Sequence, residues 1–117
     1  MSSSVPDLSP REFSGQLTRA ETLVVLDVRE PFERSICTIV VVPPVVELHV
    51  PVGLVTENLE SIRSACAGMP VVVYCHHGVR SRMVAEWLAL QGLTGLSNLN
   101  GGIDAWSRSV DSQVPRY

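Results

Sequence analysis

The chain contains no lysine, because all nine basic residues among its 117 residues are arginines. Lysine supplies the amine of Schiff-base enzymes and the phosphate-binding side chain of P-loop proteins, so both kinds of chemistry are excluded. Twelve acidic residues outnumber the arginines and give a net charge of −3, and the arginines are spread along the chain. Because no basic patch is available to neutralise phosphates, we do not expect nucleic acid as a partner.

Long apolar stretches and a targeting segment are also missing. No window reaches the ~18 uninterrupted apolar residues that a membrane span needs, and the start "MSSSVPDLSPREF" lacks a charged segment followed by an apolar one. Cysteine is scarce: Cys37, Cys66 and Cys75 are odd in number and widely spaced, which argues against a disulfide framework. We therefore expect a cytoplasmic protein with free thiols and no membrane contact.

The segments that are present alternate between strand and helix patterns. "LSPREF" offers Ser9 as a helix N-cap, Pro10 at the first helical position and Glu12 as the partner in a capping box. Similar signals predict helices over 10–18, 57–68, 81–92 and 101–109, and buried strands over 22–28, 69–75 and 96–99. This order predicts one α/β domain over residues 1–117, with its core at about 8–110 and a mainly parallel central sheet covered by helices on both faces.

One segment does not fit the alternation. "TIVVVPPVVELHVPVG", residues 38–53, is apolar but interrupted by Pro43, Pro44 and Pro51. Proline cannot donate to a sheet ladder, so no single central strand can run through this segment. We expect an irregular connection followed by a strand near 46–50.

The stretch "VVVYCHHGVRSR", residues 71–82, joins a buried strand to a helix and carries a thiol at the join. Ligands of α/β sheets bind beyond the carboxyl ends of the strands, where helix N-termini attract anions. Cys75 occupies such a position, Gly78 permits a tight cradle of amides, and Arg80 adds positive charge. Such surroundings favour a reactive thiolate, and the alternative is a buried, inert thiol that ends a strand.

Other polar residues near this stretch allow more than one interpretation. His76 and His77 are able to bind an anion or transfer protons, or they form the wall of the site while the backbone does the work. No Cys or His partner stands at zinc-ligand spacing, so we expect no metal. Asp27 and Arg29, at the end of the first buried strand, predict a structural ion pair rather than a catalytic one. Cys66 lies on the apolar face of its helix and is predicted to be core.

Three motifs together resemble the single-domain rhodanese, or thiosulfate sulfurtransferase-like, family: "LDVREPFE", then "VVVYCHHGVRSRMVAEWLALQG", then "NLNGGIDAW". The resemblance runs from about Leu8 to the C-terminus and implies a rhodanese-like fold with no cofactor. It implies that Cys75 carries a persulfide and that Asp27 and Arg29 lie under or beside the active loop. The residues whose amides it implies around the transferred sulfur are His76, His77, Gly78, Val79 and Arg80. The implied partners are a small anionic sulfur donor and a cyanide or thiol acceptor, with an acceptor protein as a further candidate.

Loop length separates this interpretation from its rivals. Cys75 and Arg80 have four residues between them, whereas phosphatases that use the same nucleophile have five and therefore a wider cradle. A phosphatase or arsenate reductase is thus disfavoured, and a non-catalytic module that carries sulfur or binds a partner remains an alternative. Residues 40–48 replace the family's compact turn with a longer apolar stretch, which is a candidate surface for self-association or partner binding.

Overall fold

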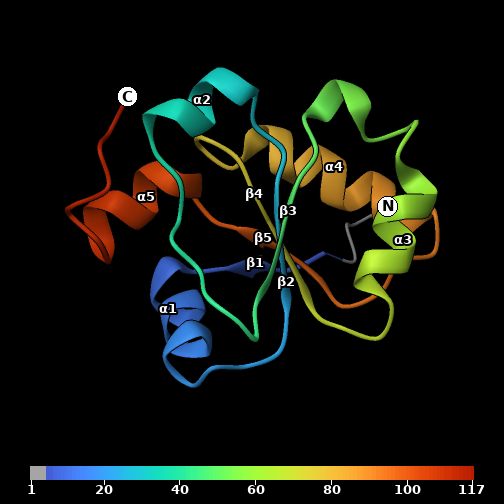
Figure 1. The fold of residues 1–117 in the computed structure, drawn as a ribbon, viewed down its shortest axis with the longest axis horizontal. Helices are drawn as coiled ribbons and strands as arrows, with labels where there is room; N and C mark the ends of the chain where they lie inside the picture. Colours follow the sequence, from blue (N-terminus) through green and yellow to red (C-terminus); the bar gives the residue numbers. More distant parts are fainter. Residues whose placement is uncertain (1–4) are drawn as a thin grey trace.

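The computed structural model describes residues 5–117, which form a five-stranded sheet with helices on both faces (Figure 1). The strands are β1 (Asp7–Leu8), β2 (Val24–Asp27), β3 (Val46–His49), β4 (Val71–Tyr74) and β5 (Leu96–Leu99). The helices are α1 (Pro10–Thr18), α2 (Pro31–Ile36), α3 (Leu59–Cys66), α4 (Val79–Leu90) and α5 (Gly102–Ser109), with a 3₁₀ turn η1 (Val52–Leu54). The predicted α/β class is confirmed.

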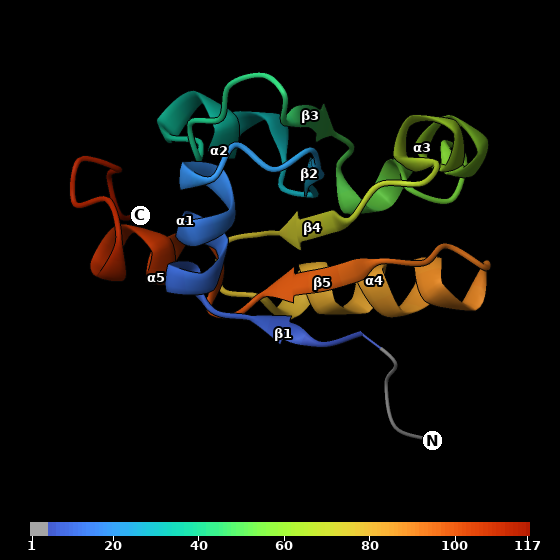
Figure 2. The same ribbon diagram turned by 90° about the horizontal axis from the view of Figure 1, so that it is seen from below.

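All strand pairs of the sheet are parallel, in the order β1-β5-β4-β2-β3. Figure 2 shows this order from β3 at the upper edge to β1 at the lower edge. Because the strands are parallel, their carboxyl ends lie at one edge of the sheet, and the segments that follow them meet there. The expectation of a mainly parallel sheet is therefore met in full.

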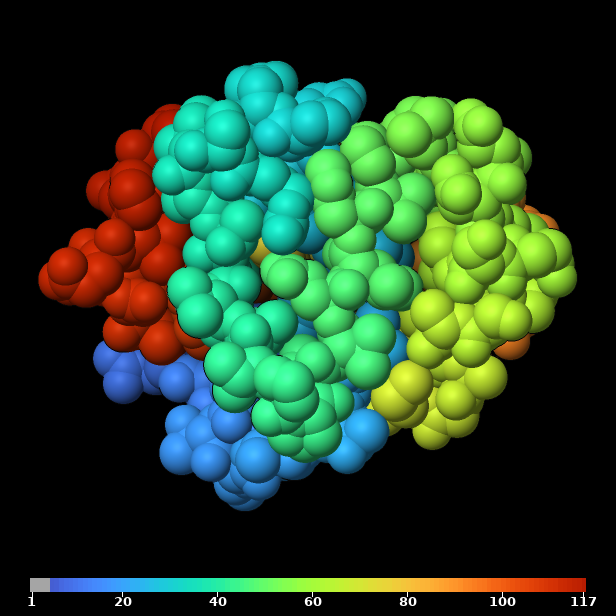
Figure 3. All heavy atoms as spheres, viewed as in Figure 1, coloured from blue at the N-terminus to red at the C-terminus, as the bar shows by residue number. Residues whose placement is uncertain are grey.

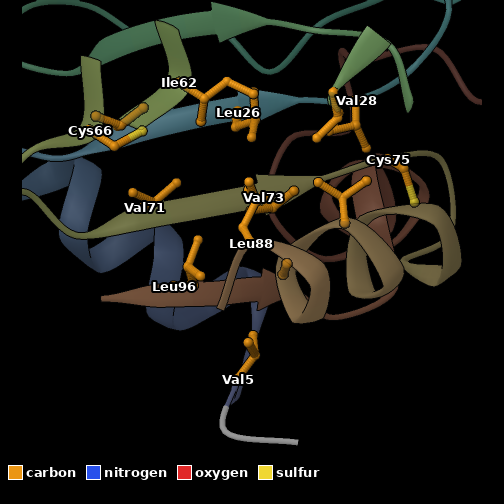
Figure 4. Packing of buried hydrophobic residues seen from close by; sticks show 14 residues of the cluster. Val5, Leu26, Val28, Ile62, Cys66, Val71, Val73, Cys75, Leu88 and Leu96 are labelled. Atoms are coloured by element: carbon orange, nitrogen blue, oxygen red, sulfur yellow. The ribbon is translucent and has the colours of Figure 1, made fainter. Parts of the chain in front are cut away.

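The two faces of the sheet bury two separate apolar clusters. Successive strand residues point to opposite faces, so Leu26 and Val73 pack with Leu88 of α4 and Ile62 of α3 (Figure 4). On the other face the neighbouring strand residues pack against α1 and α5, where the rings of Phe13 and Trp106 lie 5.4 Å apart. Fully buried central strands explain why β2 and β4 read as unbroken apolar runs.

Where the sequence carries a clear capping signal, the helix begins or ends as we predicted. Ser9 accepts a hydrogen bond from the Glu12 amide at 3.1 Å while the Glu12 carboxylate accepts one from the Ser9 amide at 3.0 Å. The capping box is therefore complete, and α1 begins at Pro10 as predicted. At the far end of α3, Gly68 takes φ +76°, the left-handed conformation expected of the residue that ends a helix.

Three elements escaped the sequence analysis. β1 has only two residues and is defined by its pairing with β5. Helix α2 begins at Pro31 but buries a single residue, Glu33, so it lacks the apolar periodicity that identifies a helix. The turn η1 is three residues long and buries none of them. Each depends on tertiary contacts rather than on a local pattern.

The apolar segment after α2 is an irregular connection, as predicted. It crosses the face of the molecule seen in Figure 3, in teal and green, before it enters the edge strand β3. The Pro43–Pro44 bond within it is cis, and Val40 and Val42 are exposed. The strand itself ends at His49, one residue earlier than expected. Within residues 5–117, no helix combines the length and apolar character needed to cross a bilayer.

Candidate active site

Cys75 follows the last residue of β4 and lies beneath the first turn of α4. Its side chain is buried and points toward that turn (Figure 4). The backbone N–H groups of Gly78 and Ser81 donate to its Sγ atom at 3.1 and 3.3 Å. The first N–H groups of a helix have no carbonyl partner within it, so they are available to the sulfur. Of the predicted cradle residues His76–Arg80, Gly78 contacts Sγ through its amide, and the second amide comes from Ser81, one residue beyond them.

Two glycines let the backbone pack tightly around this loop. Gly78, the N-cap of α4, has φ +94°, which a residue with a Cβ adopts only with strain. Gly102 has φ +63°, and a Cβ at its position would collide with the carbonyl groups of Cys75 and His76. Those two carbonyls accept hydrogen bonds from the amides of Ile103 at 2.9 Å and Asp104 at 3.1 Å. The start of α5 therefore fixes the path of the thiol loop.

The sulfur also touches a polar side chain that sequence reasoning missed. The hydroxyl oxygen of Ser81 lies 3.2 Å from Sγ, and the hydroxyl donates to Asn98 of β5 at 2.6 Å. Both side chains are buried. Nothing in the linear sequence links Asn98 to the loop, because the parallel pairing of β4 with β5 is what brings it there.

Asp27 and Arg29 form the predicted ion pair, with both side chains fully buried. Nε and Nη2 of Arg29 donate to the two carboxylate oxygens of Asp27 at 3.0 and 2.9 Å. Burial alone would raise the pKa of Asp27, but the hydrogen bonds from Arg29 and Arg34 outweigh it and hold the pKa below its ordinary value. Asp27 therefore stays ionised and serves as a structural anchor at the end of β2.

Arg80 is held by a carboxylate that the sequence analysis did not identify. Its two Nη atoms donate to the two oxygens of Glu33 at 2.7 and 2.9 Å, and Glu33 is almost fully buried. Chiefly through these bonds, Arg80 lowers the pKa of Glu33 to about 2 and Glu33 raises the pKa of Arg80. Both guanidinium ends thus face Glu33, so the positive charge expected near Cys75 is paired with a buried carboxylate.

The C-terminal tyrosine closes over the same side of the loop. The Tyr117 hydroxyl donates to Glu33 at 2.9 Å and accepts from Nη1 of Arg29 at 2.9 Å. Its ring stacks on His76 with centroids 3.8 Å apart and planes 6° from parallel. Tyr117 therefore joins the buried ion pairs to the loop.

The two histidines of the loop have different surroundings. His76 is sandwiched between Tyr117 and His77, and burial, followed by the charge of His77, lowers its pKa. Its Nε2 atom is buried without a hydrogen-bond partner. His77 is exposed to solvent. His76 is thus partly enclosed rather than turned to solvent, which favours a packing role over proton transfer.

These histidines and Asp104 are the one set in residues 5–117 whose potential ligand atoms lie within 4.8 Å of one another. Lone pairs of an imidazole lie in the ring plane, and the rings of His76 and His77 are stacked, so their lone pairs do not converge on one ion. The Asp104 carboxylate already accepts from Arg108 and Arg116 at 3.2 and 3.0 Å. The arrangement is unsuited to a metal as it stands.

The other thiols lie away from this chemistry. Cys66 packs in the core, as predicted, and burial raises its pKa. Cys37 belongs to the cluster on the opposite face of the sheet. Both are free, as Cys75 is.

Together, the fold and the loop define a class of α/β proteins. In this class a cysteine directly after a central strand lies against the N–H groups of a helix N-terminus. Within that class, a family model described as "Rhodanese-like domain" matches residues 9–109, and the chain belongs to this family. The resemblance inferred from the three motifs is confirmed.

Individual relatives agree with this assignment. The chain is 30% identical over 111 residues to "Adenylyltransferase and sulfurtransferase MOCS3-1" of Zea mays, covering 92% of this chain and 23% of that protein. It is 31% identical over 109 residues to "Putative sulfur carrier protein YrkF" of Bacillus subtilis, covering 93% and 55%. "Thiosulfate sulfurtransferase GlpE" of Actinobacillus pleuropneumoniae is 48% identical over 40 residues, which are 34% of this chain and 37% of that one. The chain thus spans roughly a quarter to a half of these relatives.

A solved structure supports the fold independently. The rhodanese-related protein of Thermoplasma volcanium has a TM-score of 0.74 and 25% identity, covering 90% of this chain and 93% of that chain.

The Glu33–Arg80 pair predicts a specific dependence of stability on acid. The pKa of Glu33 in the folded chain, about 2, lies below its ordinary value of 4.5. Its stabilisation is therefore complete above pH 4.5 and is lost as the pH falls toward 2. We predict that Glu33→Gln lowers the free energy of unfolding at neutral pH by about 2–3 kcal/mol, the lower figure allowing for solvent screening at Arg80.

Urea unfolding of wild type and variant across this pH range measures the effect. The exposed Glu57 offers a matched control, and Glu57→Gln should keep the wild-type acid profile. Equal acid sensitivity in wild type and Glu33→Gln would show that the pair does not stabilise the fold.

The packing at Gly102 predicts an unequal response of two glycines to the same change. Gly102→Ala drives a Cβ into the loop carbonyls at positive φ and should cost at least about 2 kcal/mol of unfolding free energy. Gly53→Ala meets no atom within 4 Å and should be nearly neutral. Chemical denaturation of both variants checks this, and equal midpoints would contradict the proposed contact.

Proposed function

We propose that this chain is a sulfurtransferase that moves a sulfane sulfur from an anionic donor such as thiosulfate to a thiophilic acceptor through a Cys75 persulfide. The observation that carries the proposal is the contact of Sγ with the N–H groups of Gly78 and Ser81 at the start of α4. Amides directed at a sulfur stabilise negative charge that develops there, and this electrostatic contribution usually dominates such sites. No cofactor is needed for the chemistry.

In the first half-reaction the Cys75 thiolate attacks the outer sulfur of thiosulfate. A bond forms between Sγ and that sulfur, the sulfur–sulfur bond of thiosulfate breaks, and its electron pair leaves with sulfite. One negative charge remains on the outer sulfur of the Cys75 persulfide, so charge and atoms balance. The amides of the loop His76–Arg80 would hold that outer sulfur.

In the second half-reaction the acceptor takes the outer sulfur. Cyanide attacks it, thiocyanate leaves, and the electron pair of the broken bond returns to Sγ as a thiolate. A small thiol or a thiol on an acceptor protein would act in the same way. His77, two residues after Cys75, is exposed to solvent.

The relatives support a sulfurtransferase over other activities. Two of the three are named as sulfurtransferases, and the GlpE match supports thiosulfate as donor. The free cysteines suit the reducing cytoplasm, where we place the reaction.

The YrkF match supports a second candidate role, in which the domain carries a sulfur atom without catalysing its transfer. That alternative shares the Cys75 persulfide and differs in lacking catalytic transfer to a small acceptor.

The spacing of Cys75 and Arg80 is what argues against the phosphatase alternative. Glu33 takes one N–H from each Nη atom of Arg80, so the ion pair holds the guanidinium in place without using all five of its N–H groups.

Replacing the nucleophile tests the proposal directly. Cys75→Ser should reduce thiosulfate:cyanide sulfur transfer by at least about a thousandfold, because a serine hydroxyl, unlike a thiol, does not ionise near neutral pH. Intact mass after incubation with thiosulfate should rise by one sulfur atom in wild type and stay unchanged in the variant. Cys37→Ser and Cys66→Ala are matched controls, and both should retain turnover.

Full activity in Cys75→Ser would overturn the mechanism. Persulfide formation without turnover in wild type would favour the carrier role. Loss of activity in a folded Cys37→Ser variant would point to Cys37 as a resolving thiol.

Lengthening the loop tests whether its size selects sulfur. A glycine inserted between Gly78 and Arg80 gives the wider spacing of phosphatases and moves amides away from the sulfur. We predict that thiosulfate turnover falls by about 10²–10³, the effect of losing one anion-stabilising donor. The measurement is the transfer rate of variants shown to be folded by circular dichroism.

A glycine inserted beside Gly68, which has open space around it, should leave turnover unchanged. A loop insertion that transferred sulfur at the wild-type rate would remove the loop-size argument against a phosphatase.

A further inference from the structure

A buried line of hydrogen bonds leads away from the sulfur of Cys75. Ser81 Oγ lies 3.2 Å from Sγ and donates to Oδ1 of Asn98 at 2.6 Å. Nδ2 of Asn98 donates in turn to the carbonyl of Gly78 and to Oδ1 of Asp7, both at 3.2 Å. Cys75, Ser81 and Asn98 are 1%, 0% and 2% exposed, so water does not reach the centre of this line.

Chemistry fixes the direction of each bond in the line. The two partners of Nδ2, a carbonyl and an ionised carboxylate, only accept hydrogen bonds, so the amide of Asn98 must present its nitrogen to them. Its oxygen therefore faces Ser81, and this oxygen also only accepts. The single hydroxyl hydrogen of Ser81 is thus committed to Asn98. Toward Cys75 the Ser81 oxygen can only accept, and the resting sulfur must donate its own proton.

We propose that Asn98 is a positioning residue: it holds the Ser81 hydroxyl turned away from Cys75 and thereby favours the protonated, resting thiol. This inference deepens the proposed function. It rests on that function only in taking the Cys75 thiolate as the form that attacks the sulfur donor. The inference concerns the ionisation of Cys75, which can be measured whether or not the protein transfers sulfur.

The hydrogen bonds of this line depend on the state of the sulfur. With the thiol, each bond has a donor and an acceptor, because Sγ–H donates to Ser81 and Ser81 donates to Asn98. With the thiolate, the bond between Sγ and Ser81 has no hydrogen, because the proton has left for solvent and the Ser81 oxygen presents a lone pair to a negative sulfur. Ser81 can turn its hydrogen to Sγ only by leaving the buried oxygen of Asn98 unpaired. In the persulfide the charge lies on the outer sulfur, so Ser81 can return to Asn98.

The charged groups around Cys75 act from farther away than the Ser81 hydroxyl. Arg80 acts on Cys75 through its charge, which Glu33 offsets. His76 and His77 continue the same loop, and Asp104 meets that loop from α5. At the far end of the line, Asp7 is paired with Arg82 at 2.6 Å. Within residues 5–117, Ser81 alone brings a side-chain hydrogen-bonding group to the sulfur, and its hydroxyl is oriented by Asn98.

Removing the amide oxygen should therefore release thiolate. In Asn98→Leu, which fills a similar volume, and in Asn98→Ala, the Ser81 hydroxyl is free to donate to a negative sulfur. We expect about tenfold more thiolate at any pH well below the midpoint, the equivalent of one charge-assisted hydrogen bond. The measurement is the ultraviolet absorbance of the thiolate across a pH titration, with the Cys75→Ser protein subtracted.

Subtracting the Cys75→Ser protein removes the absorbance of the other thiols, Cys37 and Cys66. Burial raises the pKa of Cys66, and burial chiefly raises the pKa of Tyr117 to about 12. Asn100→Ala, an exposed asparagine two residues along the chain, should titrate like wild type.

The Ser81→Ala background decides whether the effect passes through the hydroxyl. There, Asn98→Leu should change the amount of thiolate by less than about twofold, because the group through which Asn98 acts is gone. A shift of equal size in both backgrounds would overturn the proposal and assign the effect to the Gly78 carbonyl or to the fold. An unchanged titration in both Asn98→Leu and Asn98→Ala would overturn it as well.

Discussion

The buried guanidinium of Arg29 is the interaction on which the arrangement of the site depends. A charge of this size removed from water is tolerated only when its donors are satisfied, and removing one partner of such a pair typically costs about 3–5 kcal/mol. All five N–H groups of Arg29 have acceptors: two on Asp27, the carbonyls of Cys37 and Glu33, and the Tyr117 hydroxyl. The end of β2, the middle and C-terminal end of α2, and Tyr117 are therefore held around one side chain.

Tyr117 and Glu33 connect Arg29 to the thiol loop. Tyr117 accepts from Arg29 and donates to Glu33, and Glu33 holds both ends of the Arg80 guanidinium. The Tyr117 ring also stacks on His76. The loop is thus fixed from one side by ion pairs and from the other by the amides at the start of α5, which bond the carbonyls of Cys75 and His76. A cradle fixed from both sides does not have to reorganise when charge moves onto the sulfur.

The parts of the molecule that the sequence predicts are those governed by near neighbours in the chain. The Ser9–Glu12 capping box and the apolar runs of β2 and β4 specify their own structure. The order cysteine, glycine, arginine between a strand and a helix likewise indicated amides near the thiol, because a helix N-terminus provides N–H groups whatever the rest of the fold. The amide of Ser81, which also contacts Sγ, lies outside the loop that was predicted.

The partners of these residues could not be predicted, because the chain brings them from far away. Glu33 and Arg80 are 47 positions apart, and Tyr117 and Glu33 are 84 apart. Helix α2 shows the same limit: it buries a carboxylate rather than an apolar stripe, so its place is set by Arg80 and Arg29 and not by periodicity. Ser81 and Asn98 meet only because β5 pairs with β4.

Two opposing influences therefore meet at Sγ. The N–H groups of Gly78 and Ser81, together with the charge of Arg80, favour a negative sulfur. The Ser81 hydroxyl, turned to Asn98, favours a sulfur that keeps its proton. Each hydrogen bond to a charged group is worth about 1.5–3 kcal/mol, so the hydroxyl turned to Asn98 offsets part of what the two amides contribute. The opposition exists only while the charge sits on Sγ itself. In the proposed persulfide the charge lies one atom farther out and the hydroxyl no longer conflicts with it, so the buried groups that restrain the free thiolate are compatible with that sulfur-loaded state.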